Sequence, residues 1–238
     1  MTIPPMRRPV RAFAFDVGGT VFDWHATIRD EVEALAKADG IAVDAPAFAN
    51  DWRRAMLQGV AEVRNGERGW LNADGIARAT LEPLARTSGI GDAVARSDLG
   101  RVWHRLRPWP GAAFGVAALR RTRPVVALSL LNLDILIDLS RAAGVEWDAL
   151  LSCEFIQRYK TDPEVYLSAV RWLGLSPGDV MMVATHAWDL EGARAAGLQT
   201  AFIHRPTEWG EGAIPAVAPS FVDAEVSSLD ELASVPGG

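Results

Sequence analysis

The sequence predicts an α/β fold in which a parallel sheet is interrupted, after its first strand, by an inserted all-helical subdomain. Apolar strand patterns alternate with helical patterns after residue 111, whereas only helical patterns occur between about residues 26 and 107. The segment RPWPG, residues 107–111, separates the two regions with two prolines and a glycine. Strands that alternate with helices form parallel sheets with right-handed crossovers, so the helical stretch is an insertion between the first two strands.

The first predicted strand covers residues 11–16, a short apolar run that ends at Asp16 and is stopped by Gly18 and Gly19. Helical patterns follow over about residues 26–40, 46–66, 71–89 and 91–106, each with apolar residues three or four apart and a glycine nearby. We therefore expect a helical subdomain of residues 25–107, inserted into a core domain formed by residues 1–24 and 108–238.

The second half of the chain supplies the rest of the predicted sheet. Strands are expected at residues 124–129, 148–153, 179–185 and 199–204, and helices at about 112–121, 133–142, 163–173 and 188–197. Residues 211–238 predict a loop, a short apolar strand and a final helix. The sheet should therefore have five or six strands, with the first strand in a central position.

Composition limits the class of protein. The 238 residues are 49% apolar, which is enough for a large core, and the net charge of −6 argues against general nucleic-acid binding. Cys153 is the one cysteine, which excludes a disulfide framework and a cysteine-rich zinc site. The N-terminus lacks the apolar stretch of a signal peptide, and the most apolar region is too short and polar to span a bilayer. We expect a cytoplasmic protein that binds neither nucleic acid nor membranes.

Polar side chains stand where several predicted strands end. Asp16 follows the first strand, Ser129 ends the second, and His186 and Asp189 follow the strand at 179–185. Lys160 lies in a loop just before a helix. Ligands of open α/β sheets bind at the carboxyl ends of the strands, so these side chains are expected to converge on one site.

Each of these residues also has a purely structural interpretation. Asp16 could be an ordinary turn residue, and Ser129 and Asp189 could cap helices. Lys160 could be a solvated loop charge, and His186 a polar loop residue. The convergence of several strand ends favours a functional site over these alternatives.

In their order along the chain, these residues resemble the motifs of the haloacid dehalogenase superfamily. The first motif is DVGGT, the second is Ser129 within VVALSLLN, the third is Lys160 and the fourth is Asp189. The segments YKTDPEVY and HAWDLEGARAAGLQTAFIHRP are similar to those of the type II 2-haloacid dehalogenases. VRNGERGW and WHRLRPWPG resemble segments of a subgroup that includes fluoroacetate-processing members. The resemblance covers about residues 10–210 and implies a Rossmann-like core with a helical cap.

The resemblance implies the hydrolysis of a small 2-haloalkanoic acid to the 2-hydroxy acid. The Asp16 carboxylate would attack the halogen-bearing carbon and form an aspartyl ester. Lys160 would hold Asp16 ionised, because a nearby ammonium stabilises the charged form. Water would then attack the ester, organised by Asp189 or His186. Ser129 completes the expected catalytic set.

The same resemblance places substrate-binding roles on a second group of residues. The N–H groups of Gly18 and Gly19, with Ser129 and the Thr20 hydroxyl, are expected to bind the substrate carboxylate. An arginine of the helical subdomain should grip the carboxylate or the departing halide; Arg53 is expected in this role, although Arg54 is adjacent. The family match adds Tyr166 to the site. No metal or other cofactor is expected, and the partners are a halogenated carboxylate and water, with a homodimer as a further option.

Gly18 separates the alternative reactions within the superfamily. Its phosphatases carry a second Asp at this position, which protonates the leaving oxygen, and they use Mg²⁺. Glycine can supply neither a proton nor a ligand, whereas a halide leaves without a proton. Gly18 also stands where most dehalogenases have an aromatic residue, and Leu130 and Leu131 stand in place of Asn-Gly. A Mg²⁺-dependent phosphatase-like hydrolase and a non-catalytic member that binds a small anion therefore stay open.

Overall fold

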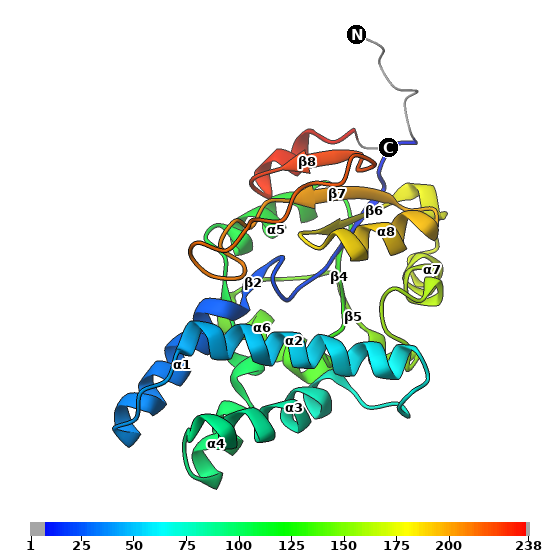
Figure 1. The fold of residues 1–238 in the computed structure, drawn as a ribbon. Coiled ribbons are helices and arrows are strands. Elements are labelled where there is room, and N and C mark those ends of the chain that lie inside the picture. The colour runs from blue at the N-terminus through cyan, green and yellow to red at the C-terminus, as the bar shows by residue number, and fades with distance from the viewer. Residues whose placement is uncertain (1–7, 237–238) are drawn as a thin grey trace.

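The structure, a computed structural model, describes residues 8–236 and contains a six-stranded parallel sheet (Figure 1). The strand order is β5-β4-β1-β6-β7-β8. The strands are β1 (Ala12–Phe15), β4 (Val125–Ser129), β5 (Ala149–Ser152), β6 (Val180–Ala184), β7 (Gln199–Ile203) and β8 (Ala224–Val226). The predicted fold class and the central place of the first strand are confirmed. Residues 1–7 and 237–238, which we assigned to the core domain, lie outside the described residues.

Strand β1 is the buried centre of the sheet. All four of its side chains are buried, and it pairs in parallel with β4 on one side and β6 on the other. Buried parallel strands have apolar residues on both faces, which explains the continuous apolar run AFAF. Phe15 lies opposite Ala127 of β4 and Val183 of β6, so Asp16 emerges at the carboxyl edge of the sheet between two neighbouring strands.

Four helices cover this sheet. Helices α5 (Ala112–Arg120) and α6 (Leu133–Ala143) pack against β4 and β5, while α8 (Ala187–Ala195) packs against β6, β7 and the neighbouring helix α7 (Pro163–Trp172). The chain moves outward from β1 in one direction through β4 and β5, and in the other through β6 and β7. Right-handed crossovers in opposite directions place the two helix pairs on opposite faces. Short 3-10 turns η2 (Cys153–Phe155) and η3 (Pro177–Asp179) precede α7 and β6.

A helical block lies beyond the sheet, next to its carboxyl edge (Figure 1). It consists of α1 (Trp24–Asp39), α2 (Ala45–Arg64), α3 (Ala73–Ser88), α4 (Ala93–Leu99) and the 3-10 helix η1 (Val102–Arg105). Helix α2 packs against both α1 and α3. The side chains of Asp23, Asp44 and Asn72 accept hydrogen bonds from the first turns of α1, α2 and α3, as N-cap residues do. The division into two domains at residues 24 and 108 stays a prediction.

The structure differs from the sequence prediction at three places. A short antiparallel ribbon, β2 (Phe22–Asp23) with β3 (Arg107–Pro108), joins the two ends of the helical block. Strands of two residues are too short to show an alternating pattern. In β3, Pro108 also argues against a strand, because proline has no N–H to donate to a neighbouring strand. The predicted helix over 91–106 is divided into α4 and η1. The predicted final helix is the 3-10 segment η4 (Asp230–Ser234), since Pro236 follows almost at once.

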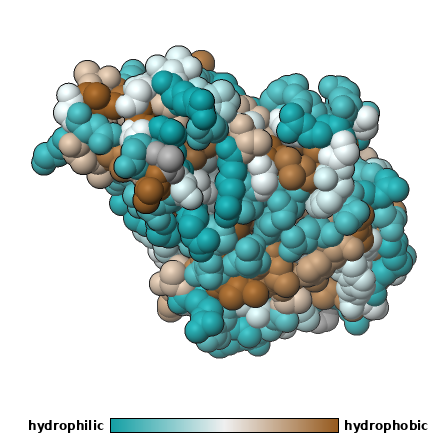
Figure 2. Space-filling model, turned by 90° about the horizontal axis from the view of Figure 1, so that it is seen from below, coloured by the Kyte–Doolittle hydropathy of each residue, from teal (hydrophilic) through white to brown (hydrophobic). Residues whose placement is uncertain are grey.

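Seen from the side of the helical block, the surface is mostly hydrophilic, with apolar residues in scattered patches (Figure 2). The helices of the described residues are all too short or too polar to cross a membrane.

Candidate active site

The centre of the site is a buried ion-pair network at the carboxyl end of β1. Lys160 Nζ donates to Asp16 Oδ1 at 3.2 Å and to Asp189 Oδ2 at 2.7 Å. The side chains of Lys160 and Asp189 have 0% exposure, and that of Asp16 has 5%. One ammonium therefore lies between two carboxylates in the protein interior, and Lys160 is not a solvated loop charge.

This arrangement keeps Asp16 ionised. Burial raises the pKa of the Asp16 carboxyl, but the charge of Lys160 and a hydrogen bond from His186 together outweigh it, so the pKa lies well below its usual value. Burial alone would lower the pKa of Lys160, and the charges of Asp16 and Asp189 raise it above the usual value. Burial and the charge of Asp16 raise the pKa of Asp189, against the effect of Lys160.

The two oxygens of Asp16 have different surroundings. Oδ2 accepts from Thr20 Oγ1 at 2.8 Å and lies 3.0 Å from His186 Nδ1, while Oδ1 has the longer bond to Lys160. The Thr20 hydroxyl in turn accepts from Thr185 N at 3.1 Å. A carboxylate oxygen has two lone pairs, so both are occupied on Oδ2, whereas the side chains of residues 8–236 occupy one on Oδ1. Oδ1 is therefore the oxygen that is free to act as a nucleophile.

The second ring nitrogen of His186 reaches a residue that the sequence did not reveal. His186 Nε2 lies 2.8 Å from Glu208 Oε1, which also accepts from Trp24 Nε1 at 3.0 Å. Glu208 is buried, and it comes from the long loop between β7 and β8, drawn in orange in Figure 1. His186 also stacks on Trp188, with 5.3 Å between the ring centroids. A chain of polar contacts thus runs from Trp24, at the start of α1, to Asp16.

The two glycines after Asp16 differ in what they permit. Gly19 has φ +90°, and a Cβ at this position would lie 2.3 Å from Glu208 Oε1, so glycine is required there. Gly19 N donates to Phe22 O at 2.8 Å, which occupies the N–H that we expected to reach the substrate carboxylate. A Cβ at Gly18 would lie 3.8 Å from Leu131 Cδ1, an ordinary van der Waals contact. The Leu131 side chain therefore packs over Gly18.

Ser129 is buried at the end of β4, and its Oγ accepts from Leu131 N at 3.1 Å. This bond holds the turn after β4 and connects Ser129 to none of the charged residues of the network. The residue that precedes α6 is Asn132, so Ser129 does not cap that helix. Ser129 therefore lies at the expected sheet edge, but its contacts differ from those of the other predicted catalytic residues.

Tyr166 contacts Asp189 at the carboxylate oxygen that does not bond Lys160 Nζ. Tyr166 Oη donates to Asp189 Oδ1 at 2.7 Å, and burial together with the charge of Asp189 raises the pKa of this phenol. Both oxygens of Asp189 thereby have donors, one from Tyr166 and one from Lys160. His186 precedes α8, and Asp189 makes these contacts instead of capping the helix. Tyr166 therefore contacts the ion-pair network through Asp189, and its functional role stays a prediction.

The two neighbouring arginines of α2 differ in burial. Arg53 is buried, and its guanidinium carbon lies 5.6 Å from the ring centroids of both Trp24 and Trp103. Arg53 Nε is buried and has no hydrogen-bond partner among residues 8–236. Burial lowers the pKa of Arg53, and the charges of Glu208 and Asp16 oppose this effect. Arg54 instead pairs with Asp51 at the surface. Arg53 is therefore the arginine that can receive a buried anion.

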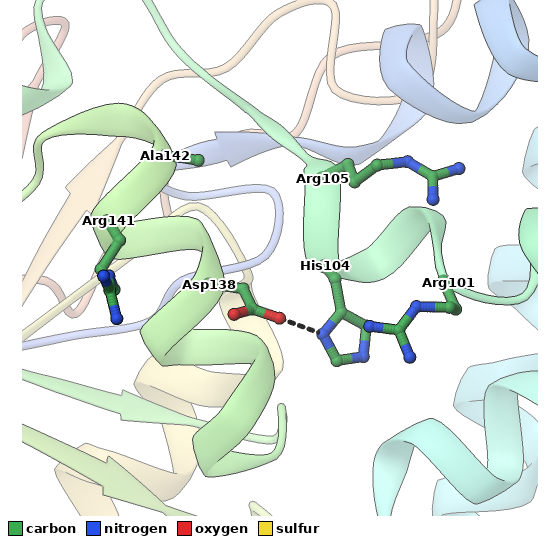
Figure 3. Close-up of a pocket in the computed structure, with 6 residues that line it drawn as sticks. All are labelled: Arg101, His104, Arg105, Asp138, Arg141 and Ala142. Atoms are coloured by element: carbon green, nitrogen blue, oxygen red, sulfur yellow. Dashed lines mark hydrogen bonds and ion pairs between the residues drawn. The ribbon is translucent and has the colours of Figure 1, made fainter.

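A surface pocket of about 500 Å³ lies away from this network, between η1 and α6 (Figure 3). The dashed line in Figure 3 marks the hydrogen bond between His104 Nδ1 and Asp138 Oδ2. The two atoms lie 2.7 Å apart. The lining residues are Arg101, His104, Arg105, Asp138, Arg141 and Ala142. This pocket contains none of the predicted site residues. Within residues 8–236, no group of three or more His, Cys, Asp or Glu side chains is placed to hold a metal ion.

Comparison with known proteins places the chain in a family of hydrolases. Residues 10–197 match the family model of the haloacid dehalogenase-like hydrolases. The chain belongs to this family.

Among its relatives, the chain is similar to 2-haloacid dehalogenases. It is 30% identical over 230 residues to (S)-2-haloacid dehalogenase 4A of Burkholderia cepacia, with 94% of this chain and 93% of the relative covered. The crystal structure of L-2-haloacid dehalogenase PA0810 matches with a TM-score of 0.88 and 39% identity, covering 94% of this chain and 97% of that one. The defluorinating L-2-haloacid dehalogenase Rha0230 matches with a TM-score of 0.90 and 37% identity, covering 97% and 98%. The predicted family resemblance is confirmed.

Proposed function

We propose that the protein hydrolyses a small (S)-2-haloalkanoic acid to the 2-hydroxy acid through an ester on Asp16. The observation that carries the proposal is the Asp16 carboxylate itself, which is buried, kept ionised by Lys160 and left with a free lone pair on Oδ1. A desolvated, oriented carboxylate is a suitable nucleophile for a saturated carbon. The names of the relatives, which specify (S)- or L-2-haloacids, support the substrate class and its configuration.

In the first step, Asp16 Oδ1 attacks the carbon opposite the halogen. The carbon–halogen bond breaks, the halide leaves with the electron pair, and the new bond joins the substrate carbon to Oδ1. Attack from the rear inverts the carbon, so an (S) substrate yields an (R)-2-hydroxy acid. Arg53 supports this step as the binding group for the substrate carboxylate or the halide, because its buried Nε has no hydrogen-bond partner in the described part of the chain.

In the second step, water attacks the ester carbonyl carbon of Asp16 and transfers a proton to Asp189. The bond to Oδ1 then breaks, and the departing alkoxide takes a proton from Lys160, which regains one from Asp189. Lys160 suits this transfer because it contacts both Oδ1 of Asp16 and Oδ2 of Asp189. Asp16 finally releases a proton, so that haloacid and water yield hydroxy acid, halide and a proton.

We also propose that the enzyme works in the cytoplasm, since a sequence with the single cysteine Cys153 suits a reducing compartment. The homodimer stays a prediction of the family resemblance.

The test is halide release from chloro-, bromo- and fluoroacetate and from both enantiomers of 2-chloropropionate, with and without a chelator. We expect halide release that the chelator does not change. A single turnover in ¹⁸O-labelled water should place the label in Asp16 and leave the hydroxy acid unlabelled. Dependence on Mg²⁺, or phosphate-ester hydrolysis without halide release, would favour the phosphatase alternative instead.

A further inference from the structure

We propose that Glu208 is a positioning residue that keeps the His186 ring doubly protonated, so that His186 Nδ1–H and Thr20 Oγ1–H stabilise the oxyanion formed on Asp16 Oδ2 during ester hydrolysis. The inference rests on the proposed function, because it assigns a part of the second step. The sequence analysis allowed His186 to organise the attacking water. The inference assigns it the stabilisation of the oxyanion instead.

The first argument is the hydrogen-bonding chemistry of the ring. His186 Nδ1 lies 3.0 Å from Asp16 Oδ2, and His186 Nε2 lies 2.8 Å from Glu208 Oε1. An ionised carboxylate oxygen can only accept, so each ring nitrogen must donate. A histidine that donates from both nitrogens is an imidazolium. Its side chain is 9% exposed, and those of Asp16 and Glu208 are 5% and 3% exposed, so the charges interact with little screening.

The surrounding charges agree with this protonation state. Burial alone lowers the pKa of His186, but the charges and hydrogen bonds of Glu208 and Asp16 raise it to about 10. The nearby cations face other groups: Lys160 bonds the opposite oxygen of Asp16, and the charge of Arg53 acts on Glu208 and Asp16. The charges that act most strongly on the ring are thus the two carboxylates.

The second argument concerns what changes when the ester forms. Esterification removes the negative charge of Asp16 and leaves Oδ2 as the ester carbonyl oxygen. Glu208 is then the carboxylate that still contacts the ring, so it alone maintains the imidazolium. At this stage Oδ2 retains its two donors, Thr20 Oγ1 and His186 Nδ1. Two donors aimed at the oxygen that becomes an oxyanion are the arrangement that stabilises such intermediates.

The third argument is that the protein holds Glu208 firmly in place. Trp24 Nε1 donates to the same Oε1 that faces His186. Gly19 leaves the space that the pair occupies, because a Cβ there would lie 2.3 Å from Glu208 Oε1 and 3.1 Å from His186 Cε1. The adjacent Trp209 packs edge-on against Trp24, with 5.0 Å between centroids.

The proton balance gives His186 a constant charge. When water attacks the ester, a proton of the water goes to Asp189, and the electron pair of the carbonyl bond moves to Oδ2. When the tetrahedral intermediate collapses, this electron pair forms the carbonyl bond again and the bond to Oδ1 breaks. An imidazolium has no free lone pair, so His186 cannot be the base in this step, and it keeps its proton throughout.

The first experiment measures the protonation of His186 by long-range ¹H–¹⁵N NMR at pH 8. Asp16→Asn replaces the carboxylate by an uncharged amide, as in the ester. We expect a doubly protonated ring in Asp16→Asn and a neutral ring in the double variant Asp16→Asn/Glu208→Gln. A doubly protonated ring in the double variant would overturn the proposal, as would a neutral ring in Asp16→Asn alone. This measurement needs no enzymatic activity, so it is independent of the proposed function.

The second experiment separates the two chemical steps of Glu208→Gln in a single turnover. We expect an almost unchanged burst of halide, followed by ester hydrolysis that is slower at pH 8 by up to about 100- to 1000-fold, because a neutral ring either lacks the Nδ1–H donor or donates from it without the positive charge. Mass spectrometry would show the accumulated ester on Asp16. Hydrolysis should recover as the pH falls and the His186 ring is protonated again, a dependence that a merely structural defect would not produce.

The matched control is Glu225→Gln, because Glu225 Oε1 contacts His204 Nε2 at 2.7 Å in an exposed pair of the same kind. This variant should keep the wild-type rates and pH profile. If Glu208→Gln hydrolyses the ester at the wild-type rate across the pH range, the proposal is wrong. If the wild type releases no halide at all, the proposed function fails, and the NMR comparison still decides the role of Glu208.

Discussion

Replacing Lys160 by methionine tests the network on which both chemical steps depend. The substitution keeps much of the side-chain length and removes the ammonium from between Asp16 and Asp189, where it bonds their oxygens at 3.2 and 2.7 Å. Removing one partner of a buried ion pair costs about 3–5 kcal/mol, because the other charge is left without compensation. For a domain of this size, the expected fall in melting temperature is roughly 6–20 °C.

The stability difference between Lys160→Met and the wild type should depend on pH. In the wild type, the pKa of Asp16 is lowered, so its stabilising contribution is present above the unfolded-state pKa and is lost on acidification. In Lys160→Met, two buried carboxylates face each other without a cation, and their pKa values should rise above those of the unfolded chain. The loss of stability that these two buried charges cause is then greatest at pH 8, and it decreases as the pH falls because the carboxylates become protonated. The stability difference between variant and wild type should therefore narrow from pH 8 to pH 5.

The assays are chemical denaturation at both pH values and halide release. Loss of the orienting charge in the first step and of the proton donor in the second should reduce steady-state halide release about 100- to 10,000-fold. Lys37 is the one other lysine and is exposed on α1, so Lys37→Met is the matched control and should change neither property. A stability difference that is the same at pH 8 and pH 5, or a Lys160→Met variant with normal turnover, would refute the reasoning.

Three further predictions follow from the site. Asp16→Asn should reduce halide release at least about 1000-fold, because an amide is a poor nucleophile; a halide assay checks this, and normal turnover would contradict it. Arg53→Lys should raise KM at least about 10-fold, whereas Arg54→Lys should leave KM unchanged, since Arg54 pairs at the surface. Gly19→Ala should lower the free energy of unfolding, measured by denaturation, by about 1–3 kcal/mol, because of the φ of +90° and the close contact with Glu208. Gly18→Ala should lower it by less than about 1 kcal/mol. Equal losses in the two glycine variants would argue against the steric account.

Sequence alone predicted the fold class and the position of Asp16 at the carboxyl edge of the sheet. Periodicity predicted the alternation of strands and helices, because apolar residues repeat at the spacing of each element regardless of what they pack against. The carboxyl ends of parallel strands meet at one edge, so Asp16 and Asp189 could be placed together before any contact was known. Lys160, in a loop just before a helix, was expected at the same edge, and in the structure its ammonium contacts both carboxylates.

The tertiary structure decided the contacts that depend on distant parts of the chain. Glu208 lies in an irregular loop, 22 residues after His186 and 184 after Trp24, and no periodic pattern relates such positions. Arg53 and Arg54 have the same chemistry on one helix, and only the packing of α2 on its neighbours decides which one is buried. Sequence patterns record local preferences, whereas the charge state and orientation of a buried side chain are set by neighbours that folding brings together.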